Sequence, residues 1–120
     1  MLFKYILLVL VSFSISSANE ADVLFVNVTC HKKNTTCDFA VTIKHDDTGW
    51  KHYANAFEVI TPDKKVLGKR ILHHPHVKEQ PFTRSLLRVS IPKGVNKVVV
   101  RAHDLVHKYG GDEVIVDLKK

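Results

Sequence analysis

The alternation of apolar and polar residues in short runs, separated by turn residues, constrains the fold of this chain most. In the run 38–44, Phe39, Val41 and Ile43 alternate with smaller or polar neighbours, which places the apolar side chains on one face of a strand. Helical periodicity is absent after residue 18, and seven runs fit strands: residues 23–29, 38–44, 54–60, 66–72, 82–91, 97–102 and 113–118. The pattern predicts an all-β fold, an immunoglobulin-like or fibronectin-III-like antiparallel sandwich of about seven strands, with a small barrel as the alternative.

The first 18 residues have the organisation of a signal peptide. Lys4 precedes an apolar run at residues 5–11, and the small residues Ser16-Ser17-Ala18 follow it. The run is shorter than the roughly 20 apolar residues of a membrane-spanning helix, so a cleaved signal is favoured over an uncleaved anchor. We predict cleavage after Ala18. Residues 19–120 would then form a single β-sandwich domain with no stable membrane span, located in the periplasm or secreted.

The two cysteines, Cys30 and Cys37, flank a polar, turn-like segment. An even number of cysteines in an exported chain predicts a disulfide bond, here one that closes a hairpin. A redox pair, or a thiolate metal site that includes His31, is the alternative, but both require reduced thiols.

The balance of charge is basic, and it narrows the choice of partner. Without Lys4, 17 basic side chains stand against 12 acidic ones and leave a net charge of +5 with neutral histidines. Such a charge suits an ordinary soluble surface, and it also permits contact with anionic lipids, sugars or an acidic protein. No compact run of Lys and Arg with interleaved aromatic residues is present, which argues against nucleic acid as a partner.

The histidines are expected to gather at one end of the sandwich. If successive strands reverse direction, every second connection lies at the same end. The connections after residues 44, 72 and 102 share one end, and the hairpin with His31 and the turns at Pro62 and Pro92 lie at the other. Seven of the eight histidines belong to the first end: His45, His52, His73, His74, His76, His103 and His107.

Converging imidazoles predict a transition-metal site, because neutral imidazole binds copper, zinc, iron and nickel. Copper or zinc fits the ligand type better than iron. The candidate ligands are His52, His74, His76, His103 and His107, with His45 in reserve. Asp46, Asp47 and Asp104 could bind the metal or fix the tautomer of a histidine. An isolated histidine is usually a surface or hydrogen-bonded loop residue, and for His31 and His73 that interpretation is preferred. A pH-sensitive surface is a further alternative.

Other side chains near this end could support a bound ligand. Trp50 and Tyr109 could shield a metal or stack on a ligand, and Arg84 could pair with a carboxylate or an anionic ligand. With Asp104, they complete the predicted set of supporting residues: Trp50, Arg84, Asp104 and Tyr109. The alternatives are a structural salt bridge for Arg84 and a lid over the core for the aromatic residues.

Four segments resemble a group of small exported bacterial proteins of unassigned function. They are the stretch from Gly49-Trp50-Lys51-His52-Tyr53 to Val59, His74-Pro75-His76, Gln80-Pro81-Phe82-Thr83-Arg84-Ser85, and Arg101-Ala102-His103-Asp104 to Gly111. This resemblance covers most of the mature chain and implies a periplasmic location.

His52-Tyr53 and His107-Lys108-Tyr109-Gly110 are also similar to motifs in the iron domain of superoxide reductases, the desulfoferrodoxin type. That family has an immunoglobulin-like sandwich whose iron is held by four histidines and a cysteine. It places a cysteine just before the late histidine, where this chain has Asp104, Leu105 and Val106.

Three functional hypotheses follow. The favoured one is an exported protein that binds a transition metal, copper or zinc ahead of iron, through the histidine loops. The second is a metal-free module that uses the same loops to bind a small ligand or a protein partner. The third is a redox enzyme like superoxide reductase. Whether the protein is an enzyme stays open at this point, since no Ser-His-Asp, paired-carboxylate or phosphate-loop pattern is evident.

Overall fold

A computed structural model describes residues 19–31 and 35–118. The predicted signal peptide and its cleavage site at Ala18 lie outside these residues and stay predictions. Within the described residues, no helix is long and apolar enough to cross a membrane.

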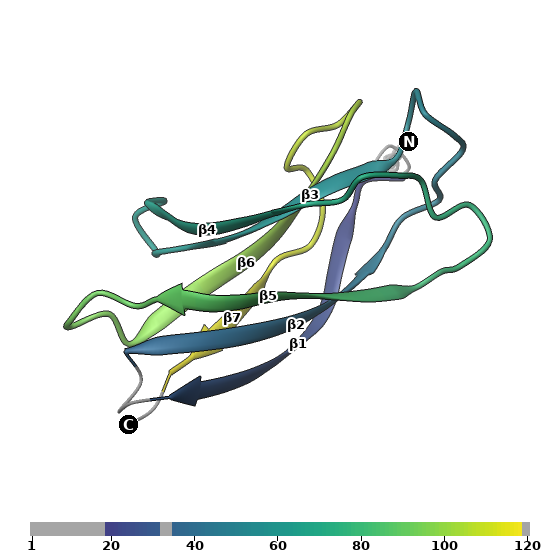
Figure 1. The fold of residues 1–120 in the computed structure, drawn as a ribbon. Helices are drawn as coiled ribbons and strands as arrows, with labels where there is room; N and C mark the ends of the chain where they lie inside the picture. The colour runs from purple at the N-terminus through teal and green to yellow at the C-terminus, as the bar shows by residue number, and fades with distance from the viewer. Residues whose placement is uncertain (1–18, 32–34, 119–120) are drawn as a thin grey trace, which may run out of the picture.

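The chain forms seven strands in two antiparallel sheets (Figure 1). One sheet has the order β1-β2-β5 and the other the order β4-β3-β6-β7. This arrangement confirms the predicted all-β sandwich. The bounds of the strands are β1 Asp22–His31, β2 Thr36–Lys44, β3 Ala54–Ile60, β4 Val66–Ile71, β5 Phe82–Ser90, β6 Lys97–Asp104 and β7 Val114–Asp117.

The core lies between the sheets and follows the alternation in the sequence. Phe39, Val41 and Ile43 of β2 are fully buried, and Phe57 and Val59 of β3 face them from the other sheet with Val98 and Val100 of β6. Each fully buried side chain of this size contributes about 1.5–3 kcal/mol relative to its exposed state. Burial of one side chain in two therefore fixes the register of these strands and the direction in which each strand ends.

A disulfide bond joins Cys30 and Cys37. The two residues are direct partners in the β1–β2 pairing, and Cys37 is fully buried. The predicted bond is confirmed, and it closes the hairpin at the end opposite the histidine loops.

The connections alternate between the two ends of the sandwich. At the disulfide end, Ile91 N donates a hydrogen bond to Thr35 O, and Leu118 N donates one to Asn96 O. At the other end, Leu105 N donates to Tyr53 O, and the main-chain nitrogen of His76 donates to Asp47. Loops 45–53, 72–81 and 105–113 therefore meet at one end, which lies toward the upper right of Figure 1.

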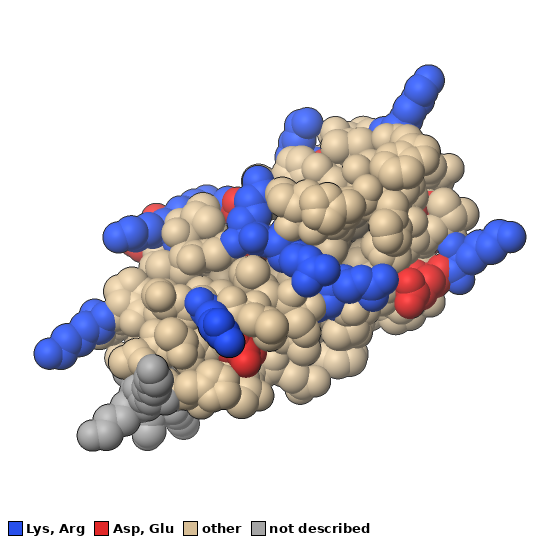
Figure 2. All heavy atoms as spheres, in the orientation of Figure 1, with Lys and Arg blue, Asp and Glu red and all other residues tan. Residues whose placement is uncertain are grey.

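Basic side chains cross the face that carries β5, and others project from both ends (Figure 2). Few acidic side chains interrupt them on this face, as the net charge of +6 for the whole chain leads one to expect.

Candidate metal centre

A buried pair of carboxylates and three histidines occupy the end where the three loops meet. Asp104 ends β6 and is fully buried, and Asp47 and His45 lie in the β2–β3 loop with side chains that are also fully enclosed. His52 comes from the same loop, and His107 follows β6; both are partly exposed. Buried charges are costly unless they are paired, so this arrangement needs a chemical reason.

His45, His52 and Asp104 point their ligand atoms at one another. His45 Nε2 lies 3.3 Å from His52 Nε2, His52 Nε2 lies 3.3 Å from Asp104 Oδ1, and His45 Nε2 lies 3.9 Å from Asp104 Oδ2. A tetrahedral site with metal–ligand bonds of about 2.0–2.1 Å has edges of about 3.3–3.4 Å. The spacing of the three groups therefore already approaches one face of a tetrahedral site.

Asp47 sets the orientation of His45. Its Oδ1 lies 2.5 Å from His45 Nδ1 and accepts a hydrogen bond of 3.0 Å from Ala54 N. Its Oδ2 accepts a 2.7 Å bond from the main-chain nitrogen of His76. Because Asp47 is anchored on both oxygens, its Oδ1 accepts a hydrogen bond from His45 Nδ1 in a fixed direction, and His45 Nε2 is directed at the centre. A carboxylate behind a histidine in this way is the usual support for a metal-binding imidazole.

Asp104 faces the histidines, and main-chain nitrogens hold its carboxylate in place. Its Oδ1 accepts hydrogen bonds from the main-chain nitrogens of Val106 (2.9 Å) and His107 (2.6 Å), and its Oδ2 accepts one from Ala21 (3.3 Å). The loop after β6 is thus wound around this carboxylate, which fixes the side chain of His107 beside it. The His107 Nδ1 atom lies 3.4 Å from Asp104 Oδ1.

His107 Nδ1 is buried and has no hydrogen-bond partner among residues 19–31 and 35–118. The ring of His107 packs against that of His52, with centroids 5.2 Å apart. A buried ring nitrogen without a partner normally costs free energy. His107 Nδ1 is therefore a third ring nitrogen beside the centre, next to Asp104 Oδ1.

The electrostatics of the centre follow from these contacts. Burial by itself lowers the pKa of His45, but the hydrogen bond to Asp47 and the charges of Asp47 and Asp104 outweigh it and raise that pKa above 6.5. Burial raises the pKa of both carboxyl groups, yet their hydrogen bonds outweigh it and hold the pKa of Asp47 and of Asp104 below the ordinary value. These contacts thus favour the protonated form of His45 between two carboxylates.

A dependence of stability on pH follows for the metal-free protein. The raised pKa of His45 means that its stabilising contribution is complete below pH 6.5 and is lost as the pH rises through the folded-state pKa. We expect the wild type to exceed His45→Gln in Tm at pH 5.5, with a difference that shrinks toward pH 9, when both are melted in EDTA. His76 and His103, whose pKa values burial lowers, are common to both proteins and cancel in the difference. A gap that stays constant or widens with pH would contradict this account.

The other predicted ligands lie outside the converging group. His103 is on β6 next to Asp104, and because successive side chains of a strand alternate in direction, it faces away from the centre. Its Nδ1 lies 2.6 Å from Asn55 Oδ1, and its ring meets that of Tyr109 edge to face. The sequence-based strand ended at residue 102 and left His103 in a loop, whereas β6 continues to Asp104.

His76 contacts Asp47 on the side away from His45, and His74 lies at the surface. His76 is buried, its ring stacks on Phe82 with centroids 4.0 Å apart, and its Nε2 accepts a 3.0 Å hydrogen bond from Arg84. Its Nδ1 lies 3.9 Å from Asp47 Oδ2. His74 is exposed and contacts the ring of His76 and its own neighbour, Pro75 O. Arg84 therefore positions His76, and the main-chain nitrogen of His76 in turn holds Asp47.

The remaining predicted residues surround the end at different depths. Trp50 is 67 % exposed and touches Tyr53 edge to face. Tyr109 lies over the guanidinium of Arg101, which pairs with Glu58 on the outer face of the four-stranded sheet. His73 is exposed, and His31 pairs with Asp38 at the opposite end.

One contact at the centre is made by a main-chain atom, which no pattern of residue types can reveal. The carbonyl oxygen of Asn19 lies 3.0 Å from His45 Nε2. A main-chain carbonyl is present in every residue, so its approach to the centre depends on the path of the chain and cannot be seen in a residue pattern.

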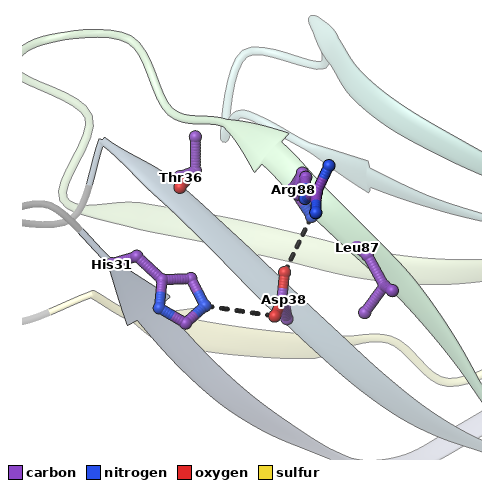
Figure 3. A pocket seen from close by; sticks show the side chains of 5 residues that line it. All are labelled: His31, Thr36, Asp38, Leu87 and Arg88. Atoms are coloured by element: carbon purple, nitrogen blue, oxygen red, sulfur yellow. Dashed lines mark hydrogen bonds and ion pairs between the residues drawn. The ribbon is translucent and has the colours of Figure 1, made fainter.

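A hollow lies at the other end of the sandwich (Figure 3). It has a volume of about 550 Å³ and is lined by His31, Thr36, Asp38, Leu87 and Arg88. Asp38 is already satisfied there by His31 and by the main-chain nitrogen of Arg88. This hollow has no connection with the histidine cluster.

Comparison with known proteins finds a similar protein but shows no family for this chain. A protein of Halomicrobium mukohataei described as "Putative lipoprotein" is 45% identical over 80 residues, which are 67% of this chain and 39% of that protein. The matched part of this chain therefore spans well under half of that relative's length. No family model matches the chain, and no solved structure matches it, so the resemblance to superoxide reductases gains no support.

Proposed function

We propose that this protein is exported or resides in the cell envelope and binds one transition-metal ion, zinc or copper, through His45, His52 and Asp104. The observation that carries the proposal is the convergence of three ligand atoms, all within 4.8 Å of one another. Without an ion, the Nε2 atoms of His45 and His52, 3.3 Å apart, can only share one proton in an N–H···N hydrogen bond. A cation placed among them satisfies both nitrogens and the carboxylate together.

The surroundings support a purpose-built site. Asp47 accepts a hydrogen bond from His45 Nδ1 and so orients the ring of His45. The main-chain nitrogen of His76 holds Asp47, and Arg84 contacts His76. His107 supplies a further nitrogen next to Asp104. Nitrogen ligands with a carboxylate suit zinc and copper better than calcium or magnesium, which prefer oxygen.

Two findings support a location outside the cytoplasm. The Cys30–Cys37 disulfide is typical of oxidising compartments. The relative described as a lipoprotein fits the cell envelope, and the predicted signal peptide would direct the chain there. Trp50, which is 67% exposed, would instead serve the metal-free alternative, in which these loops bind a partner.

The proposal is tested by the metal content of the protein. We expect chain purified from its native compartment to carry about one zinc or copper ion per molecule, by native mass spectrometry with elemental analysis, because one centre converges. EDTA should remove the ion and lower Tm, and the same ion should restore both. A protein that is isolated without metal and shows no thermal shift with either ion would contradict metal binding and favour the partner-binding module.

A further inference from the structure

The segment 19–21 lies across the proposed metal centre and is fixed on both sides. The side chain of Asn19 donates to Asp46 O (3.0 Å) and accepts from Asp46 N (2.8 Å). Ala21 N donates to Asp104 Oδ2. A Cβ added to Gly111 would collide with the carbonyl oxygen of Ala21, so the glycine lets the segment pass closely. The contacts bind this segment to the loops that carry the ligands.

The main chain of Asn19 reaches the ligand atoms themselves. Its carbonyl oxygen lies 3.0 Å from His45 Nε2, the same nitrogen that faces His52. The main-chain nitrogen of Asn19 is three bonds from that oxygen, which standard bond lengths limit to about 3.6 Å. Together with the 3.0 Å contact, this limits the distance from that nitrogen to His45 Nε2 to about 6.6 Å.

The chemical nature of this nitrogen depends on processing of the chain. In the uncleaved chain it belongs to the peptide bond after Ala18, and an amide N–H is a hydrogen-bond donor with no lone pair to offer a metal. After cleavage it is a primary amine, a nitrogen donor like imidazole. The amine and the carbonyl oxygen of one residue close a five-membered ring with a metal ion, which is a stable chelate.

We propose that removal of the signal peptide after Ala18 creates a metal ligand, the α-amino group of Asn19, and thereby completes the centre formed by His45, His52 and Asp104. This inference rests on the proposed metal-binding function and on the predicted cleavage. It makes export a condition for tight binding, because the precursor lacks the amine. The metal would then be acquired in the compartment to which the protein is delivered.

The test compares two chains with defined first residues. One is the exported chain whose intact mass shows that it begins at Asn19, and the other begins at Ser17 and so retains two native residues. We expect the longer chain to bind Zn²⁺ more than about tenfold more weakly in competition with a chelator, the loss that even an outer partner of a metal ligand causes. Equal melting temperatures in EDTA would show that both chains are folded.

Equal zinc affinities of the two folded chains would overturn the inference while leaving the metal site in place. Absence of zinc binding by both would refute the proposed function and the inference with it. A second measurement is independent of affinity: bound zinc should protect the α-amine of Asn19 from reductive methylation and leave the lysine side chains reactive. Methylation of that amine at an unchanged rate with zinc present would also overturn the inference.

Discussion

Replacing His52 with alanine should lower the affinity for zinc by more than about 100-fold, since even residues behind a metal ligand account for 10–100-fold. His52 Nε2 lies 3.3 Å from both His45 Nε2 and Asp104 Oδ1, so its removal takes away the group that joins the other two. The side chain is 18% exposed, so the substituted position stays in contact with solvent. Chelator competition with purified variants measures the effect.

His74→Ala is the matched control for this experiment. His74 belongs to the same end of the sandwich, but its side chain is exposed. It contacts the ring of His76 and the carbonyl oxygen of Pro75. We expect its affinity for zinc to stay within about threefold of the wild type, because surface substitutions usually change free energies by less than about 0.5 kcal/mol. A larger loss of zinc affinity for His74→Ala than for His52→Ala would place the metal at His74 and contradict the proposed centre.

Replacing Asp47 with alanine should lower the free energy of unfolding of the metal-free protein by about 3–5 kcal/mol. The carboxylate is fully buried and satisfies three groups, namely His45 Nδ1 and the main-chain nitrogens of Ala54 and His76. Each buried donor left without a partner costs about 1–3 kcal/mol. Urea unfolding in EDTA measures the loss, which is large against a total of about 5–15 kcal/mol for a domain.

Asp46→Ala is the adjacent control, since Asp46 is exposed and uses its main chain in its contacts with Asn19. We expect it to change the free energy of unfolding by less than about 0.5 kcal/mol. If Asp47→Ala does not fold, Asp47→Asn keeps one acceptor oxygen and should show an intermediate loss. Equal stabilities of the Asp46 and Asp47 variants would show that the buried carboxylate does not support the centre.

The fold could be predicted from the sequence because the period of the apolar pattern decides it. The alternation of Phe39, Val41 and Ile43 specifies a strand with one buried face, and turn residues such as Pro62 separate the strands. Antiparallel succession then decides the end at which each connection lies. This is why loops with His45, His52 and His107 could be expected at one end without any knowledge of sheet order.

The sequence pattern could not predict which of these residues form the centre. His103 and Asp104 are neighbours in sequence, yet the strand turns them to opposite faces, and a boundary misplaced by two residues hides that difference. The sequence left open whether Asp47 and Asp104 bind the metal or support a histidine; in the structure, Asp104 faces His52 whereas Asp47 lies behind His45. The carbonyl oxygen of Asn19 contributes through the main chain, for which a sequence offers no signal.

The most direct measurement of the central claim is the position of the metal in crystals of the zinc-loaded protein, found by anomalous diffraction at the zinc edge. We predict one strong peak at about 2.0–2.2 Å from His45 Nε2, His52 Nε2 and a carboxylate oxygen of Asp104. A peak at His74 and His76, with the ring nitrogens of His45 and His52 still facing each other and no ion between them, would contradict the account.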